Sequence, residues 1–107
     1  MELDEKLNYK AYEHQYSKGD ILSLKDTKEL ESINQILLEN NESTDIDYLN
    51  SINWYLTKEK KELLIYKKLK VVNSISWHMG IPFYILEDIE NNSSVVYMGE
   101  FYLKKYK

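Results

Sequence analysis

The chain has 107 residues, a formal net charge of −4 and no cysteine. A length of about 100 residues allows one modest core, so we expect a single domain over residues 1–107. The lack of cysteine excludes disulfides, thiol nucleophiles and zinc–thiolate sites. No apolar run reaches the roughly 18 residues that span a bilayer, and the acidic N-terminus does not resemble a secretion signal, so we expect no membrane partner and a cytoplasmic location.

Charge type and charge distribution limit the partners. All 14 basic residues are lysine, which lacks the planar fork by which arginine reads guanine edges and clamps phosphates. With a negative net charge as well, we expect no direct binding of nucleic acid. Residues 20–47 hold eight acidic residues against two lysines, whereas residues 58–70 hold six lysines against two glutamates. Such regions are typical of solvated helix faces, and they would also suit a charged partner or a homodimer.

In the first seventeen residues, apolar side chains recur every three to four positions, as at Leu3, Leu7 and Ala11, which predicts an amphipathic helix. Residues 20–24 then read as a strand after a turn at Gly19.

A helical insertion is predicted over residues 26–66. Asp26 and Glu29 stand at capping-box spacing, so a helix is expected over residues 27–39. A second helix follows, and the periodicity allows it either to continue to about Tyr66 or to break near Thr57.

Residues 67–106 predict antiparallel strands, because β-branched and aromatic residues become frequent and the connections are too short for crossover helices. Breaks are expected at residues 80–82 and 91–94. The expected strands cover residues 69–77, 83–88, 95–97 and 100–103.

Few residues point to chemistry. His14 and His78 are too few for a histidine metal site, and His78 is more typical of packing at the core rim or of a partner contact than of acid–base work. Glu87 and Asp88 are adjacent on a strand and therefore point to opposite faces. Three glycines cannot build a phosphate loop. We expect no enzyme, no catalytic residue, no metal and no cofactor. The ten tyrosines suit both core packing and a protein interface.

Short motifs along the chain carry one family resemblance. Gly19 and Asp20 open the first strand, residues 84–88 read Tyr-Ile-Leu-Glu-Asp before a turn, and residues 100–103 read Glu-Phe-Tyr-Leu. This order, over about half the chain, resembles small Src-homology-3-like barrel proteins of bacteriophages and mobile elements. The resemblance implies an α+β fold: a small antiparallel, Src-homology-3-like, partly open barrel with a two-helix insertion after the first strand.

The resemblance also implies a use. Small acidic phage proteins of this kind inhibit a host or defence protein by occupying its surface, as anti-CRISPR proteins do. The expected partner is a CRISPR effector or another nuclease in the host cytoplasm, because carboxylates on one face can take the place of phosphates. The residues expected to bind the partner are Glu39, Glu42, Asp45, Asp47, Tyr48, Trp54, Trp77 and His78.

Two other functions fit the same sequence. An antitoxin or immunity protein would present the same acidic surface to a toxin. A weak nucleic-acid-binding barrel would instead use the lysines of residues 58–70, with Trp77 and Tyr84 as stacking groups.

Overall fold

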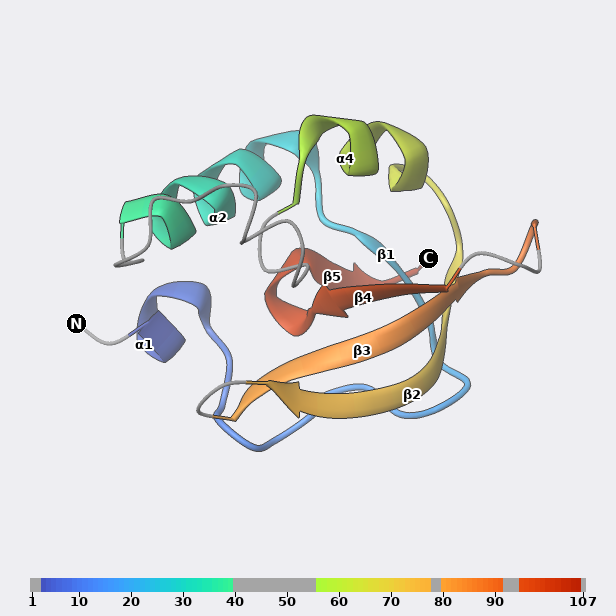
Figure 1. The fold of residues 1–107 in the computed structure, drawn as a ribbon, viewed down its shortest axis with the longest axis horizontal. Coiled ribbons are helices and arrows are strands. Elements are labelled where there is room, and N and C mark those ends of the chain that lie inside the picture. The colour runs from blue at the N-terminus through green and yellow to red at the C-terminus, as the bar shows by residue number, and fades with distance from the viewer. Residues whose placement is uncertain (1–2, 40–55, 78–79, 92–94, 107) are drawn as a thin grey trace.

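The fold combines one antiparallel sheet with a few helices, and the computed structural model describes residues 3–39, 56–77, 80–91 and 95–106 (Figure 1). The α+β class is therefore confirmed. None of the helices in these ranges is long and apolar enough to cross a bilayer. The elements are α1 (Leu3–Leu7), β1 (Ile21–Leu24), α2 (Thr27–Glu39), α4 (Lys58–Leu64), β2 (Leu69–Trp77), β3 (Ile81–Asp88), β4 (Val95–Gly99), the 3-10 turn η1 (Glu100–Tyr102) and β5 (Leu103–Lys105).

The sheet has the strand order β4-β3-β2-β1-β5, and every neighbouring pair is antiparallel. Its two edge strands, β4 and β5, are joined only by the three residues of η1. In a flat sheet these edges would lie roughly 19 Å apart, at about 4.8 Å per strand step. A 3-10 turn advances only about 2 Å per residue, so the sheet must be strongly curled. No ladder joins β4 to β5, and the sheet is not closed into a barrel.

β3 lies inside the sheet and is covered on both faces. Phe83, Tyr84 and Leu86 are each at most 1% exposed although Phe83 and Tyr84 point to opposite sides. The interruption of the strands expected at residues 80–82 is shorter than predicted, because β3 begins at Ile81. Gly80 has a φ of +82° and makes the turn, while β3 already begins at Ile81 and includes Pro82.

α2 matches its predicted range and covers the sheet with one apolar face. The Asp26 side chain accepts the Glu29 N–H at 2.9 Å, as expected for an N-terminal cap. Leu30, Ile33 and Leu37 are buried at three- and four-residue spacing.

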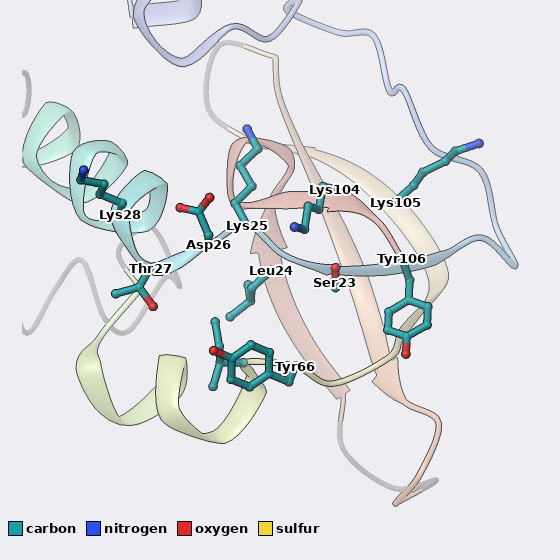
Figure 2. A pocket seen from close by; sticks show the side chains of 11 residues that line it. Ser23, Leu24, Lys25, Asp26, Thr27, Lys28, Tyr66, Lys104, Lys105 and Tyr106 are labelled. Atoms are coloured by element: carbon teal, nitrogen blue, oxygen red, sulfur yellow. The ribbon is translucent and has the colours of Figure 1, made fainter.

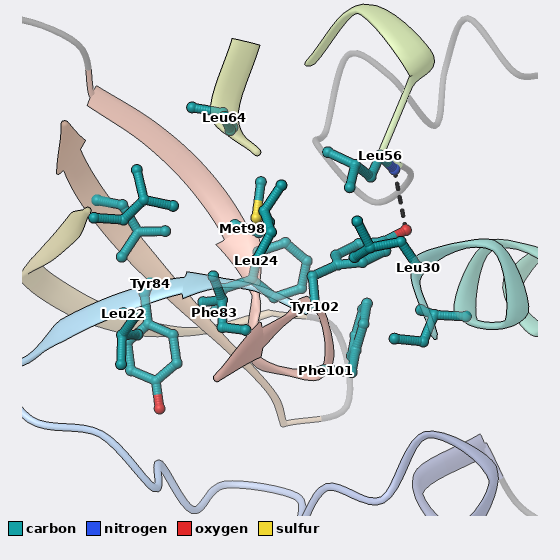
Figure 3. Packing of buried hydrophobic residues seen from close by; sticks show 14 of the residues in the cluster. Leu22, Leu24, Leu30, Leu56, Leu64, Phe83, Tyr84, Met98, Phe101 and Tyr102 are labelled. Atoms are coloured by element: carbon teal, nitrogen blue, oxygen red, sulfur yellow. Dashed lines mark hydrogen bonds between the residues drawn. The ribbon is translucent and has the colours of Figure 1, made fainter. Parts of the chain in front are cut away.

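The second helical segment begins afresh at Lys58 instead of running through Thr57. The Thr57 Oγ1 accepts the Lys60 N–H at 3.2 Å and caps α4, which ends at Leu64. Just before this cap, Leu56 donates its N–H to the buried Tyr102 hydroxyl at 3.0 Å (Figure 3). The hydroxyl in turn donates to Asn34 Oδ1 at 2.6 Å, so η1, α2 and the entry to α4 are held by one side chain.

The helix predicted for the first seventeen residues is wrong beyond Leu7. α1 ends there, and residues 8–20 form an extended N-terminal arm whose Asn8 and Tyr12 adopt positive φ angles of 58° and 63°. The arm replaces helical hydrogen bonds with bonds to the rest of the chain: Tyr12 N–H to the Gly80 carbonyl at 2.7 Å and Gly19 N–H to the Val71 carbonyl at 2.8 Å. Tertiary contacts therefore override the weak helical pattern.

The strand predicted for residues 100–103 is also wrong for its first three residues. Glu100, Phe101 and Tyr102 are all buried, at 3%, 2% and 1% exposure. A strand alternates its faces, whereas the 3-10 turn directs three successive side chains inward. The strand β5 begins only at Leu103.

Candidate functional site

Only two of the residues expected to bind a partner lie in the described ranges. Glu39 is exposed at the end of α2 and accepts a hydrogen bond from Gln35 Nε2 at 2.8 Å. Trp77 is the last residue of β2 and stands opposite Ile81 in β3. These two residues belong to different elements. The remaining six lie outside the described residues: Glu42, Asp45, Asp47, Tyr48, Trp54 and His78.

The acidic stretch divides into carboxylates with a structural role and carboxylates that face solvent. Asp20 accepts the Ser17 N–H at 2.9 Å, and Asp26 caps α2. The backbone N–H of Glu29, together with the nearby Lys104 charge, lowers the pKa of Asp26 below its ordinary value. The exposed carboxylates on α2 are Glu29, Glu31 and Glu39, so this helix presents negative charge on its solvent side.

A second surface carries the opposite charge. A cavity of about 780 Å³ opens between α2, the end of α4 and the β1–β5 pair (Figure 2). We call it the lysine groove. Its charged and aromatic lining residues are Lys25, Asp26, Lys28, Tyr66, Lys104, Lys105 and Tyr106.

Strand pairing assembles the lysine groove from distant parts of the sequence. β1 pairs with β5 so that Ser23 stands opposite Lys104, which brings Lys104 to the same side of the pair as Lys25, two residues after Ser23. The sequence prediction missed this site because it searched for charge in continuous stretches. The pairs Lys25/Lys28 and Lys104/Lys105 could have been connected only by first pairing the first and last strands.

A buried hydrogen-bond network fastens the N-terminal arm to the sheet. The Tyr84 hydroxyl donates to Glu100 Oε1 at 2.5 Å and accepts the Tyr16 N–H at 3.1 Å. Glu100 also accepts the Gln15 N–H at 2.7 Å and the Gln15 side-chain amide at 3.2 Å. His14 lies edge-on to the Tyr84 ring, and its Nε2 is 2.7 Å from the Ile75 carbonyl oxygen. The network thus binds the chain to itself.

This network excludes one proposed use of Tyr84. A base-stacking residue must expose its ring, whereas Tyr84 is 0% exposed. The prediction that Tyr84 stacks on nucleic acid is therefore wrong. Within the described ranges, no group of three or more His, Asp or Glu side chains could hold a metal ion.

Alkaline pH should weaken the fold through this network. Burial, and then the hydrogen bond to Glu100, raise the pKa of Tyr84 well above its ordinary value of 10.0, and burial also raises the pKa of Tyr16. Above about pH 10 the unfolded chain therefore loses these protons first, and the folded state holds more protons, so stability falls as pH rises. Urea unfolding from pH 8 to 11 should show this fall, with a shallower slope for Tyr84→Phe.

The exposed Tyr97 provides the control for this pH dependence, since its side chain is 45% exposed on β4. Tyr97→Phe should retain the slope of the parent protein. Equal slopes for Tyr84→Phe and Tyr97→Phe would contradict the assignment.

The chain was compared with protein-family models, curated proteins and solved structures, and none of them matches it. Two charged surfaces are the candidate sites of function: the exposed carboxylates of α2 and the lysine groove.

Proposed function

We propose that this protein is a non-enzymatic inhibitor that binds a host or defence nucleic-acid-handling protein stoichiometrically through its acidic surface. The proposed target is a CRISPR effector or a related nuclease, and the proposed origin is a phage or mobile element. The observation that carries the proposal is the difference between the two faces of α2, one buried and apolar, the other exposed and acidic. Its inner face is fixed by Leu30, Ile33 and Leu37, while Glu31 and Glu39 are exposed carboxylates beyond the cap formed by Asp26 and Glu29.

A rigid acidic helix suits this role for electrostatic reasons. Complementary charge accelerates the encounter with a basic nucleic-acid channel and suppresses binding to acidic partners. Glu31 and Glu39 lie on α2, and the sequence that follows adds Glu42, Asp45 and Asp47 without an intervening lysine. The polar clusters at Glu100 and at Asp88 form hydrogen bonds within the chain, which supports a binding role over a catalytic one.

We further propose that the curled sheet is an Src-homology-3-like barrel that stays open between β4 and β5. Two observations support this assignment. The chain returns from β4 to pair β5 with β1, as a meander must before it can close. The Gly19–Asp20 pair stands at the entry to β1. The Asp20 carbonyl oxygen accepts a hydrogen bond from the Val71 N–H of β2 at 2.9 Å. An experimental structure with β4 and β5 far apart would contradict it.

The acidic surface is tested by reversing its charges. The triple variant Glu39→Lys, Glu42→Lys, Asp45→Lys is assayed beside the parent protein against purified CRISPR effectors and other defence nucleases, with target cleavage as the readout. The parent should block at least one nuclease with an equimolar end point. The variant should weaken this block by at least about tenfold, since charge pairs across an interface contribute strongly to recognition.

A matched variant separates location from net charge. Glu13→Lys, Glu59→Lys, Glu62→Lys changes the net charge equally at exposed positions away from α2. It should inhibit like the parent. A loss of inhibition shared by both triple variants, or no inhibited nuclease at all, would overturn the proposal.

A further inference from the structure

The lysine groove is positively charged, although the chain as a whole has a negative net charge. Lys25, Lys28 and Lys104 line it with their side chains, whereas Lys105 follows Lys104 on β5 and its side chain points away from them (Figure 2). Asp26 is the carboxylate among the lining residues. Asp26 accepts the Glu29 N–H and lies near the Lys104 charge, so it offsets one of the positive charges of the groove. Among the described residues the salt bridges join other groups, Lys10 to Glu13 and Lys67 to Glu90, so none takes a groove lysine. The groove is therefore a locally positive site on a protein of net charge −4.

Tyr66 stands at the wall of the groove in a conformation that its residue type disfavours. Ile65 and Tyr66 form the centre of a type II turn, in which the Lys67 N–H donates to the Leu64 carbonyl at 3.1 Å and Tyr66 has a φ of 66°. That turn position prefers glycine or asparagine. The Tyr66 side chain is nevertheless 87% exposed, so core packing does not explain the choice.

Residues held in such disfavoured regions cluster at functional sites. Figure 2 shows the Tyr66 ring on the wall formed by the end of α4, with the Lys25 and Lys104 side chains on the wall formed by the β1–β5 pair. Tyr66 is therefore an exposed aromatic ring at the border of a positively charged groove.

A second aromatic ring completes the lining. Tyr106 follows β5 and is 40% exposed, and the Lys68 Nζ lies 5.2 Å from its ring centroid. Across the N-terminal end of α2, a smaller hollow of about 360 Å³ shares Lys25 and Lys28 and is also lined by Lys6 and Glu29. Lys25 and Lys28 therefore border both hollows.

We propose that the lysine groove binds a single strand of nucleic acid, with its phosphates against the lysines and its bases stacked on Tyr66 and Tyr106. A positively charged groove with exposed aromatic rings is the arrangement that single strands require, because only unpaired bases offer free faces for stacking. The absence of arginine predicts binding without sequence preference. Binding at this groove depends on its local positive charge instead of the net charge of the chain, and the proposal does not depend on whether the chain is an inhibitor.

Fluorescence anisotropy with a labelled oligothymidylate at low salt measures the binding directly. The logarithm of the association constant should fall with the logarithm of salt concentration with a slope of roughly −2, because each phosphate neutralised on a single strand contributes about −0.7 and three lysines face the groove. Competition with the equivalent duplex and with an oligoglutamate peptide defines the ligand. Single-strand preference supports the proposal. Absent binding, or equal competition by duplex or peptide, overturns it.

Tyr66→Asn separates stacking from folding. Asparagine tolerates the left-handed turn position, so the urea midpoint should be equal to or above that of the parent. Affinity for oligothymidylate should fall by about fivefold or more, the loss expected for one stacked base. Unchanged affinity in this folded variant would overturn the stacking role.

The lysines are tested by a matched pair of double variants. Lys25→Gln with Lys104→Gln should reduce the magnitude of the salt slope by about 1.4. Lys58→Gln with Lys61→Gln makes the same change in net charge on α4 and should leave the slope unaltered. Equal effects of both double variants would mean that binding follows net charge alone, which would overturn the site.

Discussion

Glu100→Ala should destabilise the protein by about 2–4 kcal/mol, because it removes the acceptor of the Tyr84 hydroxyl and of the Gln15 N–H from a buried site. Hydrogen bonds to a charged group contribute more than neutral ones, and donors left without an acceptor incur a desolvation cost. Relief of the buried carboxylate offsets part of this loss. Urea unfolding measures the difference, and amide exchange at Gln15 and Tyr16 should accelerate because the arm loses its anchor.

Two comparisons make the Glu100 result specific. Glu100→Gln retains an amide oxygen as acceptor and should cost less than the alanine variant. Glu31→Ala removes an exposed carboxylate from α2 and should change the unfolding free energy by no more than about 0.5 kcal/mol. If Glu100→Ala unfolds like Glu31→Ala, the network does not hold the arm.

Local signals in the sequence were sufficient for the helices and strands whose own residues determine them. α2 begins at its capping aspartate and ends at Glu39 as predicted, because cap and apolar stripe lie within one short segment. β2 likewise covers its predicted range. The N-terminal arm and η1 were missed because their conformations depend on distant partners: Glu100 receives the Gln15 N–H across 85 positions of the chain.

The same distinction applies to the surfaces. Runs of like charge are visible in a sequence, so the acidic side of α2 could be predicted. Glu39, which the sequence assigns to this side, is exposed in the structure. The lysine groove depends on the β1–β5 pairing and on the turn at Tyr66, which no local pattern reveals. Net charge averages two surfaces of opposite sign, so it describes neither the exposed carboxylates of α2 nor the lysine groove.

The attachment of the helices to the sheet depends on Tyr102, and Tyr102→Ala should strongly destabilise the protein. The ring is 1% exposed and contacts Phe101 with centroids 4.9 Å apart (Figure 3). Removing a buried aromatic ring costs about 3–5 kcal/mol, a large share of the roughly 5–15 kcal/mol that stabilises a native protein. Circular dichroism and urea unfolding measure the loss.

Tyr102→Phe separates the hydroxyl from the ring. It keeps the packing but leaves the buried Leu56 N–H without its acceptor and Asn34 Oδ1 without its donor, which should cost about 1–3 kcal/mol. The loss should be local to the helical insertion: amide exchange should rise in α2 and α4 more than in β3, because the partners of this hydroxyl are Asn34 on α2 and Leu56 at the entry to α4. Uniform acceleration across the sheet would show instead that Tyr102 stabilises the core as a whole, and that α2 is held in place by its leucines alone.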